Sequence, residues 1–257
     1  PDFAGRGGKR NIKIASTANA DEELSRLAAL DAQTVTLGEP DYPSALAAID
    51  DAPPVLVVRG NPAALTQIGI AIVGARNASA NGRRIAEVLA AELAADPGVA
   101  IISGLARGID TSAHAGAISE GGATVAVMAG GIDIVYPPEN EDLYRNILET
   151  GAIVSEMPPG VKPVARHFPR RNRIVSGLSL AVIVVEAAQR SGSLITARLA
   201  GEQGRAVLAV PGSPLDPRAF GANHLIREGA ILIRNAEDVF EAVRPMATPA
   251  MPLVETP

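Results

Sequence analysis

The chain has 257 residues, of which 47% are hydrophobic, and carries a formal net charge of -5 at pH 7. This length and composition predict an ordered globular protein of one large or two small domains, and they exclude a disordered chain. The absence of cysteine excludes disulfide bonds and thiolate metal sites, and it is typical of the reducing cytoplasm. No apolar run reaches membrane-spanning length, and no signal-peptide pattern is present. Because the first residue is Pro1 and not Met, we expect the chain to be a fragment of a longer protein.

The N-terminal quarter is predicted to be an arm followed by a small appendage. Residues 1–18 are rich in Gly and charge, which indicates a flexible arm. In residues 19–66 we expect two helices, at 21–30 and 44–49, and two short strands, at 33–37 and 55–58. Prolines surround the second helix, so we expect this appendage to pack on the next domain and not to fold alone.

From residue 67 to 243, apolar strands alternate with helices. Strands are expected at 68–74, 99–104, 123–131, 152–157, 180–187, 206–212 and 231–235. Helices are expected at 83–95, 109–119, 140–149, 169–176, 193–202 and 223–228. This pattern predicts an α/β fold, an extended Rossmann-like, doubly wound, mostly parallel sheet with helices on both faces. Residues 244–257 are Pro-rich and are predicted to be a tail, or a linker to a missing C-terminal domain.

Several predicted strands end in Gly-containing turns that lead into helices. These turns begin at Gly74, Ser103, Gly130 and Glu186. Helix N-termini favour anions, and three of the turns also carry an arginine, namely Arg76, Arg107 and Arg190. Ligands of such folds bind at the carboxyl ends of the strands, where the strand order reverses. We therefore expect several phosphates along this rim; the simpler alternative is that the glycines only make tight turns.

The stretch from Lys162 to Gly177 gathers positive charge in an acidic chain. One aromatic, Phe168, lies among its basic residues, and no Asp or Glu occurs from Met157 to Val185. The basic residues are Lys162, Arg166, Arg170, Arg171 and Arg173. Basic side chains interleaved with an aromatic are typical of single-stranded nucleic-acid binding. The alternatives are a solvated basic turn, or a structural corner with Phe168 buried and the arginines paired to acidic helices.

Signatures of nucleotide-dependent enzymes and metal sites are absent. There is no phosphate loop with a Lys, and Ser103-Gly104 stands where a dinucleotide site needs an acidic residue, so we expect no cofactor. Asp110, Ser112 and His114 lie close in sequence, but no nucleophile elbow is present. We interpret Asp110 and His114 as capping and packing residues, and the three scattered histidines predict no metal site.

The motif order VGAR, SGLARGID, HFPRRNRIVSGLS, VVEA, RSGSLITA, PGS and HLIREGA resembles the DNA-processing protein A (DprA/Smf) family. The resemblance covers roughly residues 36–238. It implies a dimeric cytoplasmic protein that binds single-stranded DNA without catalysis and loads the RecA recombinase during natural transformation. The DNA contacts that it implies are Arg76, Phe168, Arg171, Asn172 and Arg173, and less strongly Gly104, Ser191, Gly192 and Ser193. The basic residues Arg107, Lys162, Arg166 and Arg170 complete the predicted DNA-binding set.

Many members of that family carry a helix-hairpin or sterile-alpha-motif-like domain before this region and a winged-helix-like domain after it. Neither is visible here, and they would attach at the two ends of the chain. A different class of function is also open, the hydrolysis of nucleoside monophosphates by a related Rossmann-like group. That group relies on a G-G-x-G-T-x-x-E turn with a catalytic Glu, whereas this chain has RSGSLITA, ending in Ala197. The loss of the Glu favours the DNA-binding interpretation.

The segment NHLIREGAILIRN predicts a homodimer interface near the end of the sheet. An unpaired apolar edge strand invites association unless a partner covers it. We therefore expect Leu225 and Ile226, on a short helix, and Ile231 and Ile233, on an edge strand, to form the interface. The alternative is that Ile231 and Ile233 face the core.

Overall fold

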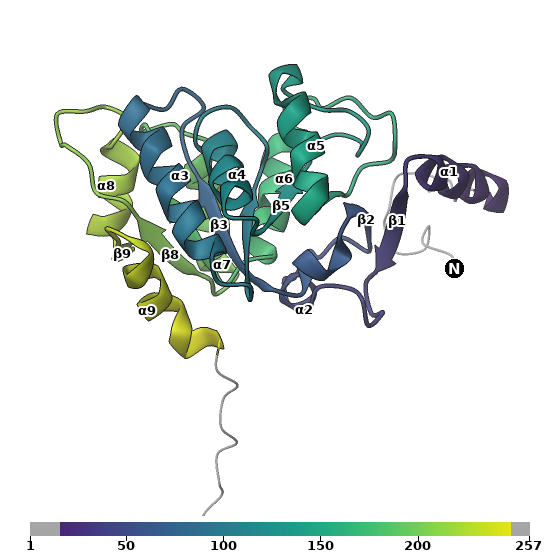
Figure 1. The fold of residues 1–257 in the computed structure, drawn as a ribbon, viewed down its shortest axis with the longest axis horizontal. Helices are drawn as coiled ribbons and strands as arrows, with labels where there is room; N and C mark the ends of the chain where they lie inside the picture. Colours follow the sequence, from purple (N-terminus) through teal and green to yellow (C-terminus); the bar gives the residue numbers. More distant parts are fainter. Residues whose placement is uncertain (1–15, 248–257) are drawn as a thin grey trace, which may run out of the picture.

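The computed structural model of the chain describes residues 16–247, and its centre is a nine-stranded sheet (Figure 1). The strand order is β1-β2-β6-β5-β4-β3-β7-β8-β9. The strands are β1 (Ala32–Thr36), β2 (Val55–Gly60), β3 (Ile68–Val73), β4 (Val99–Ser103), β5 (Ala123–Val127), β6 (Ala152–Ser155), β7 (Ala181–Val184), β8 (Ala206–Ala209) and β9 (Ile231–Leu232). The helices are α1 (Thr17–Ala29), α2 (Ser44–Ala47), α3 (Ala80–Ala94), α4 (Ile109–Ser119), α5 (Glu141–Thr150), α6 (His167–Gly177), α7 (Ser193–Glu202), α8 (Phe220–Arg227) and α9 (Ala236–Ala247). There are also two short 3₁₀ helices: η2 (Pro62–Leu65) lies between β2 and β3, and η3 (Pro138–Asn140) precedes α5.

The sheet is parallel from β6 across to β9. The chain lays β4, β5 and β6 on one side of β3, and then returns through α6 to lay β7, β8 and β9 on the other. Central strands such as β7 are buried at every residue, because helices cover both faces. This arrangement confirms the predicted doubly wound, mostly parallel α/β fold.

The residues of β3 show how the two faces are filled, because successive side chains point to opposite sides of a sheet. Ile70 and Ile72 pack with buried residues of α3, α4 and α9. Ala71 and Val73 pack with buried residues of α6 and α7. In Figure 1, α3 and α4 accordingly lie in front of the sheet, and α6 and α7 lie behind it. No helix within residues 16–247 is long and apolar enough to cross a membrane.

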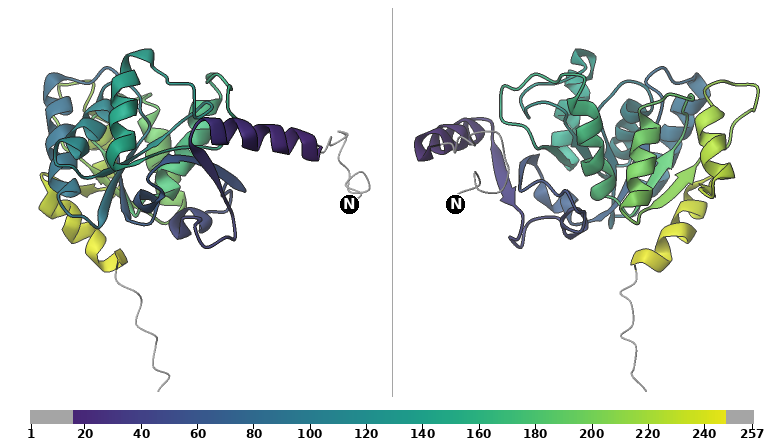
Figure 2. Two further views of the ribbon diagram at one scale, coloured as in Figure 1. Left: turned by 45° about the vertical axis from the view of Figure 1, so that its right-hand side comes forward. Right: turned by 180° about the vertical axis from the view of Figure 1, so that it is seen from behind.

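The N-terminal segment differs from its prediction in two respects. Its strands β1 and β2 extend the main sheet, since β2 pairs antiparallel with β6 and Val58 lies opposite Val154. The helix α1 begins at Thr17, two residues inside the expected arm, because the Ser16 side chain accepts the Asn19 backbone N–H and caps it. Figure 2 shows α1 at the outer end of the sheet, beside β1. The rest of the expected arm, residues 1–15, lies outside the described part of the chain.

The C-terminal segment contains a helix that the sequence analysis missed. Helix α9 continues to Ala247, past the predicted boundary at residue 243, and its Val239 and Val243 are buried against the sheet. The predicted strand at 231–235 shortens to Ile231–Leu232, because Ile233 turns into the core beneath α9. The rest of the expected tail, residues 248–257, lies outside the described residues.

Candidate nucleic-acid interface

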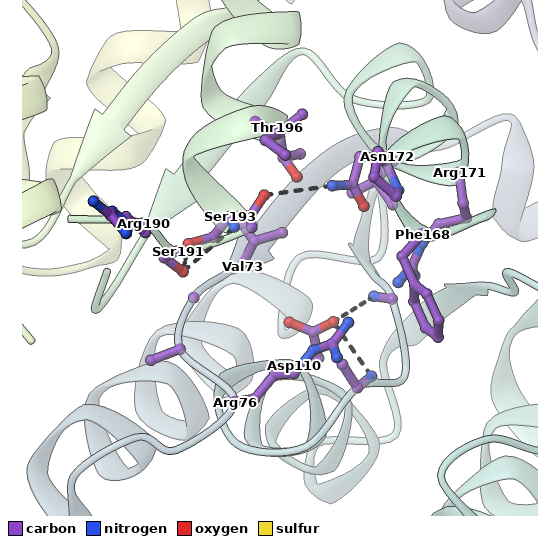
Figure 3. A pocket seen from close by; sticks show the side chains of 18 of the residues that line it. Val73, Arg76, Asp110, Phe168, Arg171, Asn172, Arg190, Ser191, Ser193 and Thr196 are labelled. Atoms are coloured by element: carbon purple, nitrogen blue, oxygen red, sulfur yellow. Dashed lines mark hydrogen bonds between the residues drawn. The ribbon is translucent and has the colours of Figure 1, made fainter. Parts of the chain in front are cut away.

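A cavity of about 940 Å³ opens at the carboxyl ends of β3, β4 and β7, where the strand order reverses (Figure 3). The turns after these three strands form most of its wall, and α6 closes the remaining side. This position and size are typical of ligand sites in open parallel sheets. The cavity brings together a set of the predicted DNA-binding residues, namely Arg76, Gly104, Phe168, Arg171, Asn172, Ser191, Gly192 and Ser193.

Helix α6 faces the cavity with one side of its first two turns. Pro169 is the third residue of the helix, where a backbone N–H has no helical partner, so proline is tolerated there. Phe168, Arg171, Asn172 and Val175 recur at helical spacing and line the cavity. Arg170 and Arg173 therefore point elsewhere, although they belong to the same basic stretch.

Arg171 is held at the base of the cavity with 6% of its surface exposed. One of its N–H groups donates to the Val127 carbonyl at 2.6 Å, whereas its Nε has no partner. Gly104 makes room for the guanidinium, because a Cβ at that position would lie 1.9 Å from Arg171 Nη1. Burial lowers the pKa of Arg171 to about 10, Asp110 opposes this shift and Arg76 adds to it. Arg171 thus keeps its positive charge at neutral pH and has donor capacity left for an anion.

Asp110 uses its carboxylate to fix the turn after β4. Its Oδ2 accepts the backbone N–H groups of Gly104 at 3.1 Å and Ala106 at 3.3 Å. Burial raises the pKa of Asp110, while Arg171 and the two N–H groups act in the opposite direction. The turn also holds Leu105 at a φ of 55°, and Asn140 donates to the Leu105 carbonyl. Gly104 lines the cavity, but Asp110 accepts its backbone N–H, so that N–H is not free to bind a phosphate.

His114 is fully buried beneath this turn and bonds to Thr124. The Thr124 hydroxyl donates to the Ile101 carbonyl, so it accepts from His114 Nδ1–H, and His114 Nε2 is left without a partner. Burial, with a contribution from Arg171, lowers the pKa of His114 to about 3. His114 is thus a neutral packing residue, as predicted, whereas Asp110 does not cap α4, which has no side-chain cap, but holds the turn before it. Within residues 16–247, no cluster of His, Asp and Glu could hold a metal ion.

Arg76 and two aromatic side chains, Phe168 and Tyr136, form one wall of the cavity. The Arg76 guanidinium lies over the Phe168 ring, with Cζ 4.9 Å from the ring centroid. Tyr136 packs beside Phe168, with ring centroids 5.7 Å apart and planes inclined by 60°. Tyr136 was not among the predicted DNA-binding residues, although it lies in the turn after β5, at the same edge of the sheet as the other turns.

The turn before α7 forms the wall opposite Arg76 (Figure 3). The hydroxyl groups of Ser191 and Ser193 bond to each other at 2.7 Å, and α7 begins without a side-chain cap. The Asn172 amide donates to the Gly192 carbonyl at 3.4 Å, which links α6 to this turn. Two further arginines line the same wall, Arg190 and Arg218, and Arg218 pairs with Asp216.

The other basic residues predicted to bind DNA do not line the cavity. Arg173 is buried in ion pairs with Glu156 at 2.6 Å and Asp51 at 3.2 Å, so its expected phosphate contact is wrong. Arg170 is exposed and pairs with the same Glu156. Arg107 pairs with Glu139 at the edge of a small neighbouring hollow. Lys162 and Arg166 are exposed in the loop that leads to α6.

The predicted interface residues fall into two groups. Ile231 is 44% exposed on the edge strand β9, next to the equally exposed Leu232. Leu225 and Ile226 are only partly buried on α8. Ile233 is fully buried with residues of α9, so its assignment to an interface is wrong.

Comparisons with known proteins agree with this architecture. The sequence profile of the family described as DNA recombination-mediator protein A matches residues 33–244. The DNA processing protein DprA of Bacillus subtilis is 46% identical over 209 residues, which are 81% of this chain and 70% of that protein. The X-ray structure of DprA from Streptococcus pneumoniae superposes with a TM-score of 0.82 at 40% identity, covering 88% of this chain and 78% of that one. A DprA structure from Helicobacter pylori, described as giving insight into its single-stranded DNA binding mode, superposes with a TM-score of 0.73 at 30% identity and covers 83% of this chain and 97% of that one.

Proposed function

The chain belongs to the DNA recombination-mediator protein A family, and we propose that it binds single-stranded DNA in the cavity at the strand ends without acting as an enzyme. The observation that carries this proposal is Arg171. It is a buried guanidinium that keeps unused donors at the base of an open cavity. Such a group recognises a phosphate oxygen with a strong, charge-assisted hydrogen bond.

The surroundings of Arg171 favour a single strand over a duplex. Arg76 adds a second positive charge, and Phe168 and Tyr136 add aromatic surface at the mouth. Phosphates and unstacked bases are both available in a single strand, whereas the bases of a duplex are stacked and hidden. The proposed DNA-binding residues at the cavity are Arg76, Phe168, Arg171, Asn172, Arg190 and residues 191–193.

The chemistry of the cavity supports a binding role. The Asp110 carboxylate accepts two backbone N–H groups. Burial lowers the pKa of His114 to about 3, so its imidazole is neutral. The competing function, cleavage of nucleoside monophosphates, needs a Glu where this chain has the buried Ala197. We expect no adenine to be released from AMP, and release that follows the purified protein would contradict a non-catalytic role.

RecA is proposed as a partner on the family resemblance, and a second copy of the chain is proposed on an exposed apolar edge of the sheet. We propose that the protein protects incoming DNA in the cytoplasm and loads RecA onto it during natural transformation. We also propose a homodimer through the apolar edge at Ile231 and Leu232. Ile231→Asp should give a folded monomer in light scattering, and an unchanged dimer or a monomeric parent would end this idea. A loading role predicts a shorter lag before RecA hydrolyses ATP on strands coated with a competing single-strand binding protein.

The test of DNA binding is the anisotropy of a labelled oligothymidine and of a duplex of equal length, measured at several salt concentrations. We expect tighter binding of the single strand and a linear fall of log affinity with log salt, by about 0.7 per phosphate contact. Equal affinity for the duplex, or no binding of either, would contradict the proposal.

A further inference from the structure

A small hollow lies beside the main cavity and shares the wall that Arg76, Phe168 and Tyr136 form. We call it the side hollow, and its lining residues are Arg76, Gly104, Ala106, Arg107, Tyr136, Pro137 and Phe168. Arg76, Gly104, Ala106, Tyr136 and Phe168 also line the main cavity. The side hollow holds only about 10 Å³, so a strand in the main cavity could continue along the shared wall and across the mouth of the side hollow, but not into it.

Phe168 is poorly placed to accept a base in the free protein. Arg76 covers one face of its ring, with Cζ 4.9 Å from the centroid, and Tyr136 packs beside it. Two aromatic rings with centroids 5.7 Å apart are already in contact and leave no gap for a third ring between them. Phe168 thus resembles a support that fixes Arg76 and Tyr136.

Tyr136 differs from the other two tyrosines of the chain. Tyr42 and Tyr144 are buried, and their hydroxyl groups donate to the carbonyls of Pro53 and Ile132. Tyr136 is 43% exposed, so much of its ring meets solvent at the wall shared by the two hollows. An exposed aromatic ring, held in place by a second ring and flanked by arginines, is the arrangement on which single-stranded bases stack.

Arg107 supplies the charge that a second nucleotide would need. Its partner Glu139 is on the surface, and both side chains are about half exposed. Such a surface pair contributes little, so a phosphate can replace Glu139 at small cost. Arg107 is near enough to Tyr136 for the tyrosine to contribute to its raised pKa, after the larger effect of Glu139.

We infer that Tyr136 is a base-stacking position of its own, and that its exposed ring, at the wall shared by the main cavity and the side hollow, stacks the base of the nucleotide next to the one whose phosphate meets Arg171. This inference rests on the proposed binding of single-stranded DNA and adds a second position to it. The ligand chemistry is a base with an adjoining phosphodiester. Any base fits, because stacking uses the face that all bases share.

The chain contains no tryptophan, so Tyr136→Trp introduces a single reporter at the inferred position. We expect oligothymidine to quench its fluorescence and to do so over the same concentration range in which anisotropy reports binding. Leu24→Trp is the matched control, because Leu24 is 52% exposed on α1, at the outer end of the sheet. Its fluorescence should not change when the same strand binds.

Two further variants test the energetic role. Tyr136→Ala should weaken binding of oligothymidine about 10-fold without changing the salt slope, whereas Tyr136→Phe should bind like the parent. If the parent and the Leu24→Trp protein bind no single strand, the proposed function itself fails. If they bind, but Tyr136→Trp is not quenched or Tyr136→Ala binds as tightly as the parent, the proposed function stands and the second stacking position is wrong.

Discussion

Helix α6 carries two buried arginines whose surroundings differ. Arg173 meets the carboxylates of Glu156 and Asp51, and neighbouring Arg170 shares Glu156, so two positive charges face two negative ones. Arg171 lies on the cavity side, where Arg76 and Arg171 face the single carboxylate of Asp110. One side of the helix is electrically balanced, and the other has an excess of positive charge next to an open cavity.

The difference shows that burial and charge alone do not identify a binding arginine. Both residues are nearly equally buried, since Arg171 exposes 6% and Arg173 exposes 7% of its surface. What separates them is whether acidic side chains use their donors. A balanced buried pair belongs to the scaffold, and removing one partner leaves an unpaired charge. Arg173 also has one donor without a partner, its Nη1, but Arg173 does not line the cavity, whereas Arg171 does and is therefore available to a ligand. The variants below test this contrast.

The largest expected effect is on the scaffold side. Arg173→Met leaves the nearly buried Glu156 with only the exposed Arg170, so we expect a loss of about 3 kcal/mol in the free energy of unfolding. Chemical denaturation measures this loss. Arg170→Met is the matched control and should cost less than about 1 kcal/mol, because Arg170 is largely exposed. A salt slope of DNA binding that fell in Arg173→Met would show that Arg173 contacts phosphate after all.

The next effect is on the cavity side. Arg171→Met should weaken binding of a single strand by about 2 kcal/mol, the value of a hydrogen bond to a charged group. The salt slope should fall by about 0.7, which corresponds to one lost phosphate contact.

A second substitution separates recognition from folding in that experiment. Combining Arg171→Met with Asp110→Asn removes the leftover buried charge, and the amide oxygen can still accept both N–H groups of the turn, since one carboxylate oxygen accepts them now. If this double variant is as stable as the parent and binds the strand as tightly, Arg171 is not the phosphate contact.

Acid should lower the stability of the fold through His114, which is buried on α4 beneath the turn after β4. His114 stays neutral in the folded protein down to a pKa of about 3, whereas an unfolded histidine takes up a proton near pH 6.5. The unfolded state therefore binds more protons below pH 6.5, and stability falls as the pH falls. The contribution from His114 is about 1.4 kcal/mol between pH 7.5 and 5.5. A variant with Gln at this position, His114→Gln, should lose that part of the slope; equal slopes would contradict the buried neutral imidazole.

The smallest effect concerns the aromatic support. Phe168→Ala removes the ring beneath Arg76, a contact of about 1 kcal/mol, and it also loosens Tyr136. Binding should weaken with nearly the same salt slope, because no phosphate contact is lost. Thermal melting on the same sample is the control. If binding is lost only in proportion to unfolding, Phe168 is a structural corner residue.

The sequence predicted the sheet well because its signal is local. Strands that are apolar throughout and separated by helices could be recognised within short windows, and the turns after β3, β4 and β7 do meet at one edge. The pairing of β2 with β6 could not be predicted, since Val58 and Val154 are far apart in the chain. Part of the site could be predicted for the same reason. Phe168, Arg171 and Asn172 recur at helical spacing in the sequence and therefore share one face of α6.

The errors at the site come from partners that the local sequence does not contain. The basic stretch has no acidic residue of its own, yet Glu156 just before it and Asp51 from the N-terminal segment neutralise Arg173. Likewise the sequence does not show that the backbone N–H of Gly104, a predicted DNA contact, is bound by Asp110 six residues later. Tyr136 was overlooked because it follows β5 by several residues, and only the fold brings its turn back to Phe168.

The return of the chain through α6 has a consequence for how the protein is made. On its way from β6 to β7, the chain passes over β5, β4 and β3, so the cavity wall joins turns from both halves of the sequence. Loop-closure entropy must be overcome before these distant segments meet, and a chain still emerging from the ribosome has no cavity before α7 docks. A ligand in the cavity binds only the complete fold and thus opposes its global unfolding by mass action. The cavity therefore forms only when the fold is complete, and a ligand bound in it indicates a completely folded chain.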